Sequence, residues 1–213
     1  TGETTPAHTT VVGKVYDGPQ PATVIWNAQQ TAGDCTLYTP EVPRCTTPCA
    51  GTEACVATDT CQAYPTSHAI GDVTVTGVKT AAGASTFTMS PVVNGYQPSA
   101  ATALAYPPFA EGDVITMTAT GSDFTPPFAI GTTGIAPLEL TTDPIALASG
   151  TALTLAWTPP TASGATIHVK LDISHHGGSK GKIECDGADD GNLTIEASMV
   201  DALLALGAAG FPT

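Results

Sequence analysis

Residues 165–185 read ATIHVKLDISHHGGSKGKIEC and contain the clearest strand pattern in the chain. Apolar and polar side chains alternate along residues 165–174, so one set should face a core and the other solvent. A Gly-rich turn follows, and KIEC at 182–185 has strand composition again. The stretch therefore predicts a β-hairpin. Its inward set is Ile167, Val169, Leu171 and Ile173, and its outward set is His168, Lys170, Asp172 and Ser174.

Short apolar segments separated by Gly, Pro, Asp and Asn recur through the rest of the chain. About ten such strands predict an all-β fold, specifically an immunoglobulin-like β-sandwich. A Pro- and Ala-rich passage at 91–111 predicts a long loop. Trp26 and Trp157 each end an apolar segment, so both are expected in the core. The further strand candidates are 10–16, 22–28, 69–78, 85–90, 113–121, 128–132, 137–140, 152–157 and 193–197.

A single helix is predicted, at 198–206 near the C-terminal end. Ser198 and Asp201 have the spacing of a capping box, an apolar stripe follows, and Gly207 is suited to end the helix. The predicted organisation is an extended Thr-rich arm at 1–12 followed by a sandwich domain at 13–213. A disulfide-rich module at 34–64 is inserted in that domain.

Composition narrows the functional class. The 213 residues carry 19 Asp and Glu against six Lys and Arg, a formal net charge of −13, and 42% are hydrophobic. That hydrophobic content argues against a disordered chain. Without a basic stripe, nucleic acid is not an expected partner. No apolar run approaches the ~20 residues of a membrane helix. Carboxylates remain suited to hard cations such as Ca²⁺.

The six cysteines indicate disulfide bonds and an oxidising compartment. Five lie within residues 35–61, so full oxidation needs at least one bond from that cluster to Cys185. The count alone leaves the pairing open; we favour Cys35–Cys185 with a local knot of two bonds. Zinc is the alternative, but the spacing lacks a C-x2-C knuckle. The two local bonds would be Cys45–Cys55 and Cys49–Cys61.

Two short motifs resemble catalytic ones and fail on context. Residues 177–181, GGSKG, match the nucleophile elbow G-x-S-x-G, which needs a helix after it and a downstream His. Here a strand is predicted next, and no His follows His176. SHHGG at 174–178 resembles a motif of metallo-β-lactamase-type hydrolases, but H-x-H-x-D-H is absent. We therefore expect no catalytic residues and no enzyme.

A metal site is the alternative use of the polar residues near the hairpin. Asp172, His175 and His176 could converge in a turn, although adjacent histidines on extended backbone face opposite ways. CDGADDGN at 185–192 resembles a loose calcium loop, but the first Asp is displaced and the closing Glu is missing. Acidic Gly-rich clusters more often form hairpin turns. The residues of this second candidate are Asp186, Asp189 and Asp190. We expect no resident cofactor.

Two resemblances carry further expectations. LTLAWTPP with ATIHVKLDI, within 153–173, looks like the Trp-bearing strand and the next strand of fibronectin type III and related sandwiches. More of the chain resembles uncharacterised secreted lipoproteins of Gram-negative bacteria. That likeness rests on the Cys-rich stretch at 33–65, on GDVTVTG and YPPFAEGDVI, and on the closing segment at 172–207. It implies an extracellular or outer-surface address and a lipid-bearing Cys upstream of Thr1.

The sequence thus predicts a non-enzymatic structural or assembly protein of the cell surface or the extracellular space, acting as an adhesive or a scaffold. The Thr-rich arm and an incomplete sheet favour self-association by strand exchange, as in a filament subunit. Other surface proteins are alternative partners. A module that binds a metal ion (Ca²⁺ or a transition metal) or carbohydrate is the alternative function.

Overall fold

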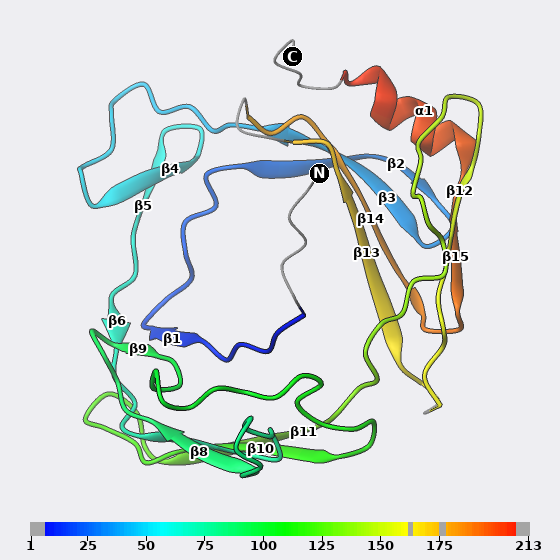
Figure 1. Cartoon of the computed structure of the whole chain (residues 1–213). Helices are drawn as coiled ribbons and strands as arrows, with labels where there is room; N and C mark the ends of the chain where they lie inside the picture. Colours follow the sequence, from blue (N-terminus) through cyan, green and yellow to red (C-terminus); the bar gives the residue numbers. More distant parts are fainter. Residues whose placement is uncertain (1–6, 162–163, 175–177, 208–213) are drawn as a thin grey trace. The chain divides into compact units, whose positions relative to one another are not determined.

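The computed structural model describes residues 7–161, 164–174 and 178–207 (Figure 1). As predicted, the chain is mostly β, with several antiparallel sheets, one short helix and disulfide bonds. It divides into two compact units: unit 1 comprises Thr1–Gln20 and Pro65–Pro137, and unit 2 comprises Pro21–Tyr64 and Leu138–Thr213. This division does not test the predicted arm at 1–12 or the predicted single sandwich domain at 13–213, and both stay predictions.

Unit 1 contains two antiparallel sheets, with strand orders β6-β1-β9 and β11-β10-β7-β8. The passage at 91–111 is mostly loop, as predicted, but it includes one short strand, β9. The strands are β1 (Gly13–Tyr16), β6 (Ser67–His68), β7 (Val73–Thr76), β8 (Thr86–Met89), β9 (Gly95–Tyr96), β10 (Val114–Ala119) and β11 (Phe128–Thr133).

The four-stranded sheet of unit 1 separates apolar from hydroxyl side chains by strand alternation. Val73 and Val75 of β7 are buried in the core of unit 1. Thr74, between them, faces the other way, and its hydroxyl lies 2.9 Å from that of Thr88 on β8. Cross-strand threonine pairs of this kind stabilise adjacent strands.

A two-residue turn before β9 holds Val93 and Asn94 at φ values of 49° and 57°. Backbone hydrogen bonds between Val92 and Gly95 close the turn in both directions, at 2.8 and 2.9 Å. Positive φ at both central residues defines a type I′ turn, which prefers Asn-Gly at these positions. The sequence offers Asn94–Gly95, yet the turn uses Val93–Asn94. A β-branched residue is strained in this region.

Tyr96 explains why the turn does not slip to the preferred residues. Its side chain is buried, and its hydroxyl accepts a hydrogen bond from the Ile70 amide at 2.7 Å and donates one to the Gly71 carbonyl at 2.9 Å. A slip by one residue would turn Tyr96 to the opposite face of its strand. Burial of Tyr96 therefore sets the register, and Val93 keeps the strained conformation.

Unit 2 contains a four-stranded sheet, β13-β14-β3-β2, and the two-stranded sheets β12-β15 and β4-β5. The predicted hairpin is confirmed, because β13 and β14 pair antiparallel with Asp172 opposite Lys182. Its elements are β2 (Ile25–Ala32), β3 (Cys35–Glu41), β4 (Glu53–Ala57), β5 (Thr60–Ala63), β12 (Leu153–Ala156), β13 (Thr166–Asp172), β14 (Lys182–Ala188), β15 (Asn192–Ile195) and α1 (Ala197–Ala205).

The acidic segment between β14 and β15 is not the hairpin turn that its composition favours. β15 pairs with β12 instead of β14, so residues 189–191 carry the chain from one sheet to another. Asp189 has a structural role in this connection: its carboxylate accepts a hydrogen bond from the indole nitrogen of Trp157 at 2.5 Å. Trp157 itself is buried in the core, as predicted.

The core of unit 2 lies between β12–β15, the central strands β3 and β14, and helix α1. Met199, Val200 and Leu203 supply the apolar stripe of the helix and are completely buried. The predicted inward residues of β13 pack against this core. Strand alternation and helical periodicity thus place the apolar side of the strands against the apolar side of helix α1.

The predicted capping box is wrong. The helix begins one residue earlier, at Ala197, after the N-cap residue Glu196, which makes no side-chain cap. Asp201 instead turns toward a loop of the same unit. Its carboxylate accepts hydrogen bonds from the Ser149 hydroxyl at 2.7 Å and the Gly150 amide at 2.8 Å. These bonds lower the pKa of Asp201.

The three disulfides have the pairing favoured by the sequence. Cys35–Cys185 joins β3 to β14 inside the core, and the two bonds Cys45–Cys55 and Cys49–Cys61 attach the β4–β5 hairpin to the preceding loop. Residues 35–41 of the predicted insert at 34–64 form β3 and thus belong to the four-stranded sheet of unit 2.

Replacing Cys35 and Cys185 together by Ala should lower the free energy of unfolding by about 5 kcal/mol, because the bond spans 150 residues. Removing Cys45–Cys55, which spans only 10 residues, should cost about 3 kcal/mol. Chemical denaturation of the two double variants measures both values. A larger loss for the short bond would contradict the loop-length argument.

Substitution of Val93 by Gly should raise the free energy of unfolding by about 0.5–1 kcal/mol. The gain from relieving left-handed strain exceeds the entropy cost of glycine, and Val93 is 87% exposed, so few contacts are lost. Asn94→Gly is the matched control and should change stability less, since Asn tolerates this conformation. Urea titration of both variants measures the free energy of unfolding. A Val93→Gly variant that is less stable than the parent chain would contradict the proposed strain.

Candidate functional site

The solvent face of the β13–β14 hairpin carries the densest group of charged residues that the sequence singled out. Three residues of β13 lie opposite three of β14, and each pair combines opposite charges or charge with imidazole. Such cross-strand pairs stabilise a sheet by a few tenths of a kcal/mol up to ~1 kcal/mol each. The pairs are His168 with Asp186, Lys170 with Glu184, and Asp172 with Lys182.

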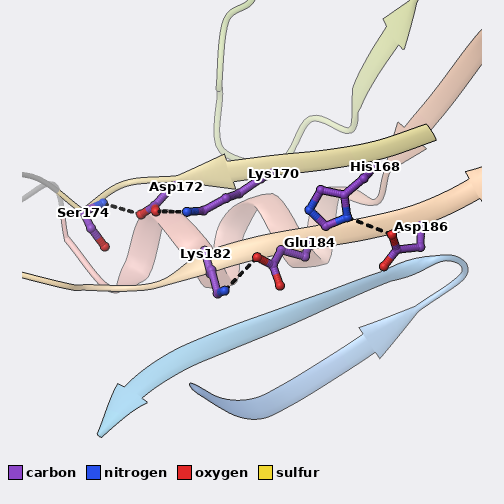
Figure 2. A network of polar contacts seen from close by, with 7 residues as sticks. All are labelled: His168, Lys170, Asp172, Ser174, Lys182, Glu184 and Asp186. Carbon is purple, nitrogen blue, oxygen red and sulfur yellow. Dashed lines mark hydrogen bonds and ion pairs between the residues drawn. The ribbon is translucent and has the colours of Figure 1, made fainter. Parts of the chain in front are cut away.

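Figure 2 shows that the side chains bond partly across and partly along the strands. The His168 imidazole nitrogen Nδ1 lies 2.8 Å from the Asp186 carboxylate on the facing strand. Lys170 instead binds Asp172 of its own strand at 2.9 Å, and Lys182 binds Glu184 at 2.7 Å. Every carboxylate of this face therefore has a partner.

Asp172 is the most constrained of these groups. Burial works to raise its pKa, but hydrogen bonds from Lys170 and from the amide of Ser174, at 2.8 Å, outweigh burial and hold the pKa below its ordinary value of 3.8. The same bond raises the pKa of Lys170. Asp172 is thus a stable anion that fixes the start of the hairpin turn, and it is not poised to accept a proton.

Lys182 connects the charged face to two aromatic rings. Its ammonium lies 4.4 Å from the centre of the Trp26 ring and 5.5 Å from that of Tyr38. The expectation that Trp26 lies in the core is wrong: its ring is half-buried beneath Lys182 on the polar face. A cation over an aromatic face is stabilising by ~0.5–2 kcal/mol. The Lys182 side chain, only 12% exposed, is thus held by the Glu184 carboxylate and by the two aromatic rings.

The proposed metal ligands Asp186, Asp189 and Asp190 each bind a different partner. Asp186 binds His168, Asp189 binds Trp157, and an oxygen of Asp190 accepts the Asn192 amide at 3.4 Å. Of the first set, His175 and His176 lie outside the described residues, so a site that they would complete with Asp172 stays a prediction. The same holds for a calcium site at the three aspartates.

Over the described ranges, one close group of three ligand-type side chains occurs: Cys45, Cys49 and Cys61. The sulfur of Cys49 lies 3.8 Å from that of Cys45. All three sulfurs are engaged in disulfides, and a metal binds the thiolate form of cysteine. This cluster is therefore a structural knot in the oxidised protein.

The serine of the GGSKG match also lacks catalytic surroundings. Ser179 precedes β14, a strand, whereas a nucleophile elbow precedes a helix. On the charged face, each acid is bound to an ammonium, an amide or an imidazole. The pairs stabilise a charged sheet surface.

The sequence analysis missed a second polar cluster, in unit 1. Asp17 accepts a hydrogen bond from the Thr66 amide at 2.7 Å and lies 3.3 Å from a ring nitrogen of His68. The His68 ring stacks on Phe124 at 4.0 Å. The bonds from Thr66 and His68 lower the pKa of Asp17. No local pattern signals this cluster, because Asp17, His68 and Phe124 are far apart in sequence.

Asp172→Asn should reduce stability at neutral pH and leave it unchanged in acid. A carboxyl group whose pKa is lower in the folded than in the unfolded protein stabilises the fold at pH values above the unfolded-state pKa. This contribution disappears as the pH falls through the folded-state pKa, which lies below 3.8. Unfolding measured from pH 7 down to pH ~2 should therefore show the two proteins converging. Asp123→Asn, at an exposed carboxylate of unit 1, is the control. A difference that persists in acid would refute the ion-pair assignment.

Comparison with known proteins finds no family model, no curated protein and no solved structure that matches this chain. The likenesses to surface lipoproteins and to fibronectin-type sandwiches stay predictions. In the described ranges, no helix has both the length and the apolar character that crossing a bilayer requires. The three disulfides are typical of proteins in an oxidising environment.

Proposed function

We propose that this chain is a non-enzymatic structural subunit of the cell surface or extracellular space, an adhesive or scaffold protein that self-assembles by strand exchange. An immunoglobulin-like sandwich and an upstream lipid anchor are part of the same proposal. Three disulfides support a location outside the reducing cytoplasm. A charged face whose acids are all partnered supports a structural role over a chemical one.

One observation carries the assembly proposal: β11 is an unprotected edge strand. Among the described strands it pairs only with β10, and its six residues, FAIGTT, include no charge and no proline. Five of the six are exposed, and Ile130 retains 55% of its accessible surface. An exposed, uncharged edge is a template for pairing with another chain.

The other four-stranded-sheet edges carry features that oppose such pairing. β13 presents His168, Lys170 and Asp172, and charged side chains block edge-to-edge association. β2 is interrupted by a bulge between Ala28 and Gln30. β8 spans only four residues, and a proline follows at position 91. The contrast singles out β11 as the acceptor edge.

The N-terminal arm is a suitable donor. Residues 7–12 form no strand. The Thr9 hydroxyl donates a hydrogen bond to the Ala105 carbonyl at 2.7 Å, and Val11 packs on the core of unit 1. The preceding sequence, TGETTPAH, is rich in Thr, which favours extended pairing. As part of this proposal, the arm adds as a strand to the edge of a neighbouring subunit.

Ile130→Lys should abolish assembly and leave a folded monomer, because a lysine on the edge is incompatible with a continuing sheet. Deletion of residues 1–8 should do the same by removing the donor, while Thr9 and Val11 remain. Light scattering after size-exclusion chromatography and electron microscopy of the purified proteins measure assembly. Circular dichroism checks that each variant is folded.

Val114→Lys is the matched control, since Val114 is 73% exposed but belongs to β10, which has neighbours on both sides. It should assemble like the parent chain. A parent chain that stays monomeric at every concentration would overturn the proposed function. Assembly that survives both Ile130→Lys and the arm deletion would rule out strand exchange at β11.

A further inference from the structure

A second surface of unit 1 combines exposed apolar side chains with a cavity. Val12, Val92 and Val93 are 70%, 66% and 87% exposed. Val12 and Val92 line a cavity of about 450 Å³, together with Lys14 and Tyr96. Clustered aliphatic side chains at the rim of a hollow are typical of an interaction surface and are unusual on a surface that meets only water.

Backbone strain falls at the same place. Val93 is held in the left-handed region at the tip of its turn, although it is β-branched and almost fully exposed. The buried Tyr96 holds the turn in this register. As a consequence, the turn displays an apolar side chain at its tip, next to Val92 of the cavity lining.

Lys14 gives this surface a positive charge, which is scarce in this acidic protein. It is one of six basic residues in a chain of net charge −13, and its ammonium forms no ion pair with the described residues. An exposed cation beside Val12 and Val92 suits a segment that alternates apolar and acidic residues. A second copy of this acidic chain is a natural source of such a segment.

Residues 138–145, LELTTDPI, have this composition. Leu138, Leu140 and Ile145 are 54%, 48% and 49% exposed, and the acids Glu139 and Asp143 lie between them. Leu140 is paired with Trp157 of unit 2, which holds the middle of the segment extended. The segment presents apolar groups that complement the exposed valines and anionic groups that complement Lys14.

We infer that the surface formed by Val12, Lys14, Val92 and Val93 binds segment 138–145 of a second copy, with Glu139 facing Lys14. This inference rests on the proposed function and adds a contact distinct from the β11 edge. The two surfaces belong to different units and are unlike, so the contact is heterologous. Heterologous contacts that do not close into a ring generate open polymers.

A charge exchange tests the contact. Lys14→Glu and Glu139→Lys should each weaken self-association at least about tenfold, the size of effect seen for close interfacial charge pairs. The double variant should restore it, because the pair is re-formed with opposite polarity. Sedimentation velocity over a concentration series of the full chain gives the dissociation constants.

Lys79→Glu is the matched control, since it makes the same charge change at an exposed lysine of unit 1 outside this surface. It should leave association close to that of the parent chain. Val93→Gly is a second probe: it should weaken association while stabilising the fold, a combination that general misfolding does not produce.

The outcomes separate the two proposals. A parent chain that associates, with single variants that associate equally well, would overturn this contact and leave the proposed function intact. Single variants that weaken association without recovery in the double variant would overturn the pairing of Lys14 with Glu139. A parent chain that never associates would remove the proposed function and this inference with it.

Discussion

A buried disulfide is the constraint on which unit 2 depends. Cys35 and Cys185 are opposite each other on β3 and β14, only 4.0 Å apart between Cα atoms, and almost no surface of either is exposed. The bond fixes the pairing of two strands that are remote in sequence, and their apolar neighbours Leu37 and Ile183 form the core with the helix. Entropy removed from the unfolded chain thus supports a unit whose sheets are short.

The polar surfaces follow from this scaffold. Because β14 is held at the centre of its sheet, its outward residues and those of β13 form a ladder in which charges are neutralised locally. The protein is strongly acidic overall, yet this face contains two of its six Lys and Arg residues, together with His168. Local neutralisation lets a chain of high net charge form this sheet surface without strong repulsion between its side chains.

Sequence reasoning succeeded where the signal was periodic or arithmetic. Alternation over 165–174 predicted both the hairpin and its inward face, and the uneven cysteine count required a bond to Cys185. It failed where residues distant in sequence determine the position of a side chain. The partners of Asp201 are about fifty residues away, and the pattern around Trp26 did not show which face of its strand would be buried. The Val93 turn contradicts local preference because Tyr96 is anchored elsewhere.

The order of the units along the chain gives the Cys35–Cys185 bond a further consequence. Unit 2 is built from residues on both sides of the second part of unit 1, Pro65–Pro137, and the bond joins those two sides. Residues 35–185 are therefore a covalent ring that encloses this part. A protease that cuts any one loop of Pro65–Pro137 opens the ring but releases no fragment, so the severed ends stay joined through sulfur. Chain topology thus makes unit 2 tolerant of a single cut in this part of unit 1.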